Sequence, residues 1–574
     1  MLSQALLATT LAGLLCSFSG PAQAPRGAAE PIPDVELLRL APNDALFALR
    51  IKDPRALLSR RETSRWAAFL ADPAWHRVVA DLRDADPRDD AATEVRAESV
   101  AADLLGALGS ARSAVAIAVG DLQGRALPIL AFAALGGDEL AAPLEALLRG
   151  QGTVSDEDGL AIRAADGGVV EAYLRRGDLH LIVNAPDSTS AVAFGRAALA
   201  RLDSGAALGG RLAEFRSDAD AEFTLDLRPL WRLAAEAADL PDAALPYWSA
   251  LDSTDWLHGQ VRIGDGEALD LVLEAPYAEE GLARSLLGAF GPCDTTLLAL
   301  APVMAVSASA GRTDFGALFD SLVAEIQAQS PRQHELVVAG LKAASEAFDI
   351  DVRGDLVAGL TGDYVSFSLP PDMRVASRAM TLDERMNALD MSCTALRIAD
   401  PEPFIDAIET LLDVSGLGAE VEATTLRGAE VWTFGNELHL AVHPRFLCGS
   451  LDLDALEVFL SRVNADEDAP ASLLSQAPFS AAARGLQGTY VSLAPTKSSL
   501  SFVGNLLQLI GLSLRDSDGA GAALGTQSTE ARLARTLTEV GDLVSVLGPR
   551  YFSGTFSGRV TVQDGRIRSL NQAR

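Results

Sequence analysis

His439 and His443 are the two residues whose types and spacing come closest to a metal site. On a helix this spacing would place both imidazole rings on one face, where they could hold a zinc ion. Residues 438–442 have the pattern of a strand, however, and four residues of strand span roughly 13 Å, too far for one ion to bridge without a bend. His439 also corresponds to His180 in the first half of the chain, which has no histidine partner. We therefore interpret these histidines as structural and predict no metal site.

Three further fragments resemble parts of metal-binding motifs. His334-Glu335 begins a zinc-protease phrase, but Val338 stands where the second histidine belongs. The acidic turns at 156–159 and 516–519 resemble the beginning of a calcium loop. Neither turn has the complete series of ligands with the distal glutamate, and acidic glycine turns are common without metal. These fragments do not change the prediction.

The sequence lacks the motifs that identify several common classes of enzyme. The chain contains no Gly-x-Ser-x-Gly, no Ser-x-x-Lys, no phosphate-binding Walker loop and no Cys-x-x-Cys. We predict no catalytic residue, no cofactor and no enzymatic activity.

One insertion distinguishes the two halves of the chain and supplies our candidate binding residues. In the first half a short turn near 120–124 joins two strands, whereas the equivalent strands of the second half end near Leu369 and resume near Ser392. The insertion between these two strands contains several methionines. Methionine is over-used on surfaces that accept varied apolar partners, and loops often carry function. We predict contact with a protein or an apolar ligand, although a loop folded back on its own domain or a mobile tip is the competing interpretation. The candidate residues are Met373, Arg374, Arg378, Met380, Arg385 and Met386.

The amino terminus predicts export. Residues 1–22 carry no charged side chain, and the short apolar run 6–18 is followed by small residues. This is the pattern of a secretory signal peptide, since a membrane span needs about 20 apolar residues. Cleavage after Ala22 is favoured over cleavage after Ala24, because cleavage after Ala24 would place Pro25 at the scissile bond. We predict a signal peptide at 1–22, a leader at 23–34, and a periplasmic or extracellular location.

Removal of the signal would leave three cysteines, Cys293, Cys393 and Cys448. An odd number permits one disulfide and leaves one thiol. Cys393 opens a predicted strand and Cys448 follows another in the same half, so these two are the pair if a bond forms. Three buried free thiols are the alternative.

The charge balance restricts the partners. The chain has 47 Lys and Arg against 78 Asp and Glu, a formal net charge of -31. Nucleic acids and anionic lipids both require a basic surface, so we predict neither as a partner. We also predict no integral membrane span, because no stretch after the signal is long and apolar enough.

A phrase near the amino terminus recurs in the second half and indicates an internal duplication. Residues 37–51 form a turn and a strand, followed by a helix start at Asp53. Residues 297–310 repeat this pattern, followed by a helix start at Asp314. Further matching phrases follow in the same order, among them 179–181 with 438–440 and 258–266 with 557–565. We predict a first repeat at 35–275, a helical connector at 276–294 and a second repeat at 295–574.

Both halves mix short alternating strands with amphipathic helices. Hairpin spacing with glycine-rich turns is typical of antiparallel sheet, and aspartates at 187, 400 and 452 precede helical periodicity. The prediction is an α+β fold of two tandem duplicated domains, each a largely antiparallel sheet with covering helices.

The opening phrase Leu40-Ala41-Pro42-Asn43-Asp44 resembles the start of a family of large exported bacterial proteins of unknown function. This Ala-Pro-x-Asp phrase is short, and the second copy has Val303-Met304 in place of its Asn-Asp. The resemblance implies a similar fold over most of the mature chain, and it implies no activity.

These observations favour an exported, non-enzymatic envelope or periplasmic protein with a binding or structural role. A carrier of an apolar ligand is the first alternative, motivated by the apolar helix predicted at 500–514. A hydrolase with an unrecognised active site is the second alternative, and converging carboxylates with a shifted pKa would support it.

The export prediction can be checked directly. Protein purified from its native cell should lack residues 1–22, because the uncharged apolar start is the substrate of a signal peptidase. Sequencing of the amino terminus measures this, and a chain that still begins at Met1 would disprove export by this route.

Overall fold

The computed structural model divides the chain into two compact units, Met1–Pro276 (unit 1) and Tyr277–Arg574 (unit 2), which we describe separately. It describes residues 34–56, 68, 72–73, 110–120, 129–141, 154–157, 160–164, 170–205, 207–215, 218–228, 254–263, 269–277, 282–348, 350–370, 391–415, 421–435, 438–496, 501, 504–505, 508, 538, 540–541, 544–545, 554–563 and 566–573.

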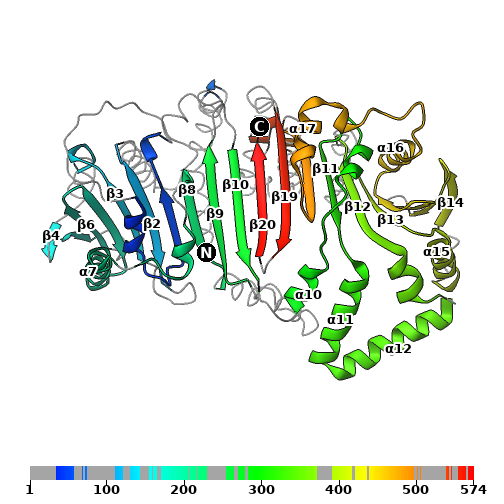
Figure 1. Cartoon of the computed structure of the whole chain (residues 1–574), viewed down its shortest axis with the longest axis horizontal. Coiled ribbons are helices and arrows are strands. Elements are labelled where there is room, and N and C mark those ends of the chain that lie inside the picture. The colour runs from blue at the N-terminus through cyan, green and yellow to red at the C-terminus, as the bar shows by residue number, and fades with distance from the viewer. Residues whose placement is uncertain are drawn as a thin grey trace, which may run out of the picture. The chain divides into compact units, whose positions relative to one another are not determined.

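Ten strands of unit 1 lie within the described residues, and every pairing between them is antiparallel. From the outer edge, the pairings give the order β4-β5-β6-β7-β3-β2-β1-β8-β9-β10 (Figure 1). The strands are β1 (Phe47–Ile51), β2 (Ser113–Val119), β3 (Ile129–Leu135), β4 (Val154–Glu157), β5 (Leu160–Ala164), β6 (Val170–Arg176), β7 (Leu179–Ala185), β8 (Ala221–Asp226), β9 (Trp256–Ile263) and β10 (Leu269–Pro276).

Three helical segments accompany this sheet: η1 (Asp34–Leu40), α7 (Ser188–Ser204) and η2 (Gly210–Glu214). Leu38 of η1 and Leu181 of β7 are fully buried in the main core of the unit, together with Val115 of β2. Burying such a side chain contributes about 1.5–3 kcal/mol. Arg201 of α7 connects this helix to η1, because its guanidinium donates to the carbonyl oxygen of Leu40 at 2.6 Å.

Unit 2 also has ten strands within the described residues, and all their pairings are antiparallel. Their order from the outer edge is β14-β15-β16-β17-β13-β12-β11-β18-β19-β20. The strands are β11 (Ser307–Arg312), β12 (Leu360–Ser368), β13 (Ser392–Ile398), β14 (Val421–Leu426), β15 (Ala429–Phe434), β16 (Leu438–His443), β17 (Phe446–Ser450), β18 (Tyr490–Pro495), β19 (Thr555–Gln563) and β20 (Arg566–Ala573).

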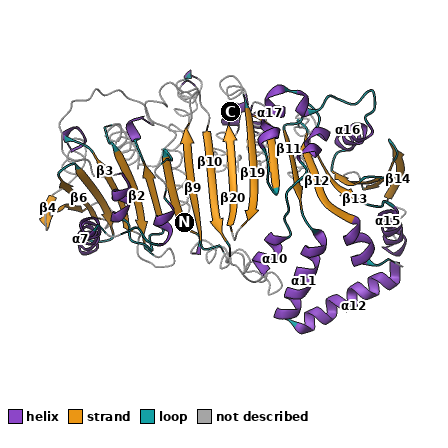
Figure 2. Cartoon of the chain, in the orientation of Figure 1, coloured by secondary structure: helices purple, strands orange, loops and turns teal. Residues whose placement is uncertain are grey.

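The helices of unit 2 lie on both faces of its sheet and beyond the strand ends. Figure 2 shows α11 and α12 extending past the ends of β11 and β12. The described helical segments are α10 (Leu282–Gly288), η5 (Thr295–Leu300), α11 (Phe315–Gln329), α12 (Pro331–Phe348), the π-helical turn η6 (Val352–Val357), α15 (Glu402–Ser415), α16 (Leu453–Asn464), η8 (Leu473–Ser475) and α17 (Ala477–Gly485).

Two apolar clusters cover opposite faces of the unit 2 sheet. Phe459 of α16 packs in the main core with Phe367 of β12 and Phe446 of β17. On the other face, Phe404 and Leu412 of α15 pack with Trp432 of β15. Neighbouring residues of a strand point to opposite faces, so Phe446 and Leu447 serve different clusters.

Asp187, Asp314 and Asp452 are helix caps, as the sequence predicts, whereas Asp400 accepts from the amide of Glu402, two residues later, at 3.2 Å. The carboxylates of Asp187, Asp314 and Asp452 each accept a hydrogen bond from the backbone amide three residues later, at 2.7–2.9 Å. Asp53 makes the same contact with the amide of Ala56 at 2.9 Å. Such a bond satisfies one of the amides that a helix leaves unpaired at its start.

The α+β fold with antiparallel sheet is confirmed by these elements. The strand predicted at 438–442 agrees with β16, and the helix expected in the connector is α10. Among the described helices, we find none with the length and apolar character needed to cross a membrane. The predicted signal and helix 500–514 fall outside the described residues, apart from single positions.

Cys293, Cys393 and Cys448 are free thiols, so the disulfide considered between Cys393 and Cys448 is not formed. Cys393 and Cys448 are buried in the core of unit 2. Burial raises the pKa of both thiols, and it raises the pKa of the half-buried Cys293 to about 11. A thiol needs its thiolate form to react, and all three therefore lie in unreactive environments.

We expect a thiol reagent to leave Cys393 and Cys448 unmodified in the folded mature protein and to modify Cys293 slowly. All three thiols should react in concentrated denaturant without a reductant. Mass spectrometry of the labelled peptides measures this. Rapid native labelling at 393 or 448 would contradict the buried environment, and a missing label in denaturant would reveal a disulfide.

Candidate functional site

The hairpin formed by β14 and β15 has an exposed strand, β14, and a turn anchored by polar contacts. Its two strands are joined by Arg427 and Gly428, with φ angles of 48° and 79°. Two consecutive left-handed residues are typical of the tight turn that suits the twist of a hairpin. Arginine rarely adopts this conformation, so side-chain contacts must hold it there.

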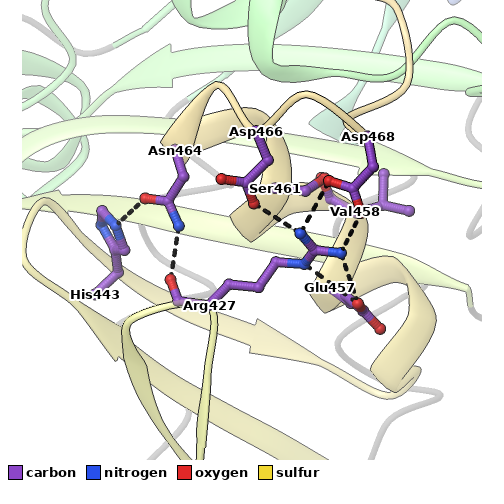
Figure 3. A network of polar contacts seen from close by, with 8 residues as sticks. All are labelled: Arg427, His443, Glu457, Val458, Ser461, Asn464, Asp466 and Asp468. Carbon is purple, nitrogen blue, oxygen red and sulfur yellow. Dashed lines mark hydrogen bonds and ion pairs between the residues drawn. The ribbon is translucent and has the colours of Figure 1, made fainter.

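The guanidinium of Arg427 provides these contacts by joining three carboxylates (Figure 3). Its nitrogens lie 3.0 Å from Glu457, 2.7 Å from Asp466 and 2.8 Å from Asp468. These acids belong to α16 and to the chain immediately after it. The hydrogen bonds with Asp468, Asp466 and Glu457 raise the pKa of Arg427, and Arg427 lowers the pKa of Asp468. We call this group the Arg427 clamp.

A second connection links the same turn to β16. Asn464 donates from Nδ2 to the carbonyl oxygen of Arg427 at 2.6 Å, and its Oδ1 lies 3.1 Å from Nε2 of His443. The backbone amide of Arg445 donates to Nδ1 of His443 at 3.2 Å, so the proton of a neutral ring is on Nε2. Burial, opposed by Asn464 and supported by the charge of Arg445, lowers the pKa of His443. The ring is therefore a neutral structural element.

His439 has a similar structural role. Its Nδ1 lies 3.0 Å from the hydroxyl of Thr433 on the neighbouring strand. His180 in unit 1 is bound on both ring nitrogens, by the hydroxyl of Tyr173 and the carbonyl oxygen of Gly136. The described residues contain no group of three His, Cys, Asp or Glu side chains that could hold a metal ion.

Unit 1 contains a different polar group, which the sequence analysis did not single out. On one face of its sheet, Arg50 pairs with Glu222, and Thr224 lies opposite His258. The guanidinium of Arg50 is 2.5 Å from the Glu222 carboxylate, and the two side chains are 1% and 0% exposed. A single buried charge costs several kcal/mol, so this pair strongly fixes the register of β1 against β8.

Asp226 extends this polar face. Its carboxylate lies 2.5 Å from Arg228 and 3.1 Å from Arg211 of η2. Burial opposes ionisation, but the hydrogen bonds and charges of Arg228 and Arg211 outweigh it and lower the pKa of Asp226. A charged residue in an otherwise apolar strand was the sequence signal that could have revealed this polar group, as with Arg50 in residues 45–51.

The candidate binding residues at 373–386 fall outside the described residues, because the described chain after β12 stops at residue 370 and resumes at 391. The calcium-like turn at 516–519 also falls outside, and that at 156–159 is described only to residue 157. His334 and Val338 both lie on α12, where the Val338 side chain is 44% exposed.

The Arg427 clamp can be tested by replacing Arg427 with asparagine, which tolerates the left-handed backbone but cannot join the three carboxylates. We expect faster amide exchange across residues 421–434 and unchanged exchange in α11, because only the hairpin loses its attachment to α16. Hydrogen exchange with mass spectrometry measures both segments. Lys342→Asn removes a charge from exposed α12, where the amine lies 3.7 Å from Glu346, and serves as the control. Equal exchange in the two variants would show that the clamp does not hold the hairpin.

Comparison of the chain with protein-family models, with curated proteins and with solved structures finds no match.

Proposed function

We propose that this chain is an exported, non-enzymatic binding protein built from two copies of one ten-stranded unit. The observation that carries the binding role is the state of the buried carboxylates. Four carboxylates are buried among the described residues, and three of them, Glu222, Asp226 and Asp363, are each paired with at least one arginine. A carboxylate held as an ion pair is a poor general acid, and its charge serves the fold. Recognition through surfaces and loops is the remaining role that the geometry favours.

The strand orders of the two units support the duplication. Reading from β4 in unit 1 and from β14 in unit 2, each strand occupies the same position and joins the same neighbours. In each unit the first strand, β1 or β11, lies between the second strand and the eighth. An order with such long-range pairings is improbable by coincidence, because sequential strands usually lie side by side.

Local contacts support the same correspondence. The amides of Ala45 and Ala305 donate to the carbonyl oxygens of Pro42 and Pro302, at 3.1 and 3.0 Å. Arg201 at the end of α7 donates to the carbonyl oxygen of Leu40 at 2.6 Å. Arg462 at the end of α16 makes a similar bond, one position earlier in the opening phrase, with the carbonyl oxygen of Ala299, also at 2.6 Å.

One match in the sequence analysis was wrong. Residues 438–440 were compared with 179–181 of β7 because both contain Leu-His-Leu. The strand β16 lies between β15 and β17, which is the position of β6 in unit 1. Three identical residues in two short strands are too few to determine the register.

The two units differ in the chemistry of equivalent positions. Ala48 and Ala308 each lie six residues after the proline of the opening phrase. Counting from them, the pair Arg50 and Glu222 corresponds to Ala310 and Val491. The latter two side chains are fully buried in an apolar core. The common fold therefore does not require the buried ion pair, and the copies have diverged toward different roles.

The insertion at 371–390 remains our candidate contact for a protein or an apolar ligand, since it is present in only one copy. A photo-crosslinking amino acid in place of Met380 should form an adduct with a partner in the native envelope. The same group in place of Leu336, which is 67% exposed on α12, should not. Mass spectrometry of the adducts provides the readout.

The outcome can be separated from misfolding. Replacing residues 372–388 by a short glycine-rich turn should preserve the circular dichroism spectrum and abolish partner binding. Retained binding by the shortened protein, or equal adducts from positions 380 and 336, would refute the assignment of this insertion.

A further inference from the structure

The structure assigns to β14 the role of an open sheet edge that accepts an extended, basic peptide segment from a partner protein. The assignment rests on the proposed binding function, but on a part of the chain separate from the 371–390 insertion. Among the described residues, β14 pairs with β15 alone. Figure 1 shows it at one edge of the unit 2 sheet. An unpaired edge presents a row of backbone donors and acceptors, and adding a strand to it is a common mode of peptide recognition.

The tight turn determines which backbone groups face outward. Leu426 and Ala429 flank the two-residue turn, so they form a hydrogen-bonded pair of the ladder. Alternate residues of β14 therefore direct their amide and carbonyl groups away from β15. By this alternation the outward groups belong to Val421, Ala423 and Thr425.

The edge lacks the features that normally prevent strand addition. The strand β14 contains no proline and no lysine, and its pairing with β15 runs without a bulge. Its four central residues, 422–425, are all exposed. By contrast, the edge strand β4 of unit 1 has only four residues. Short length is a common protection for an edge, and β14 has six residues.

The hairpin is also anchored in advance of any binding. The Arg427 clamp fixes one end of β14 to α16. Leu426 packs against the main core, and Val421 packs against the cluster on α15 at the other end. A strand that is already ordered loses little entropy when a peptide adds to it, which favours binding.

The charge of the hairpin defines the partner. Glu422 and Glu430 are exposed on the two strands, and neither strand contains Lys or Arg. The whole chain carries a formal net charge of -31. A second copy would bring like charges together, whereas an extended segment containing Lys or Arg would be attracted.

The test uses a labelled peptide of alternating Thr, Val and Lys as the probe, with a second peptide in which Glu replaces Lys. The Ala423→Pro variant lacks one outward amide but keeps the ladder to β15, since proline is tolerated where the N–H faces solvent. Ala423→Val keeps that amide and is the matched control. Fluorescence anisotropy should show that the Lys peptide binds the wild type and Ala423→Val equally well. Its affinity for Ala423→Pro should be lower by at least about tenfold.

Hydrogen exchange adds the location of binding. The Lys peptide should protect residues 421–426 and leave α11 unchanged. Thr425→Pro removes another outward amide and replaces Ala423→Pro if that variant shows an altered circular dichroism spectrum. Binding should also weaken with added salt, because part of the attraction is between charges.

Several results would overturn the assignment. These are no binding of the Lys peptide to the wild type, equal affinity of Ala423→Pro and Ala423→Val, stronger binding of the Glu peptide, or protection confined to another segment. Wild-type dimers that dissociate in Ala423→Pro would identify a second copy as the occupant instead. Success here with failure of crosslinking at position 380 would refute only the role of the insertion.

Discussion

The pairing of the first strand with the eighth strand joins the two parts of each sheet, and the remaining structure depends on it. In unit 1 this pairing joins Arg50 to Glu222 across 172 residues of sequence. Every element between β1 and β8 must fold so that these two strands meet. Long-range pairing of this kind incurs loop-closure entropy before its contacts form, so we expect β1 and β8, and likewise β11 and β18, to associate late in folding.

The two units meet this constraint by different chemistry. In unit 1 the buried ion pair of Arg50 and Glu222 permits one register, because any slip would leave charges unpaired in the interior. In unit 2, Ala310 and Val491 take the equivalent positions, and packing alone determines the register. Under the proposed duplication, a fold that accommodates either solution leaves its faces free to diverge, and this is the basis for the proposal that the units have different roles.

Arginine has a consistent structural role in this acidic protein. Arg427 holds a hairpin turn, Arg201 and Arg462 cap the opening turns of the two units, and Arg50 lies within a sheet. A planar guanidinium presents several donors at fixed angles, so one side chain can join segments that are distant in sequence. The acidic excess remains for the surface, where it favours cationic partners and opposes self-association.

The features that depend on near neighbours could be predicted from the sequence alone. The caps at Asp187 and Asp452 and the strand at Leu438–His443 follow from hydrogen bonds and alternation within a few residues, and they were predicted correctly. The insertion at 371–390 stays a prediction, because it falls outside the described residues.

Only the tertiary structure decided which strands are neighbours and which side chains meet. The alternation of residues 421–426 predicts a strand equally well at the edge or in the centre of a sheet. This strand lies at the edge because all the remaining described strands of unit 2 pair with one another on the far side of β15. Arg427 meets Glu457 and Asp468, which are 30 and 41 residues away, because α16 returns beside the hairpin. No local pattern encodes such contacts, since they arise from the packing of whole elements and not from the propensities of single segments.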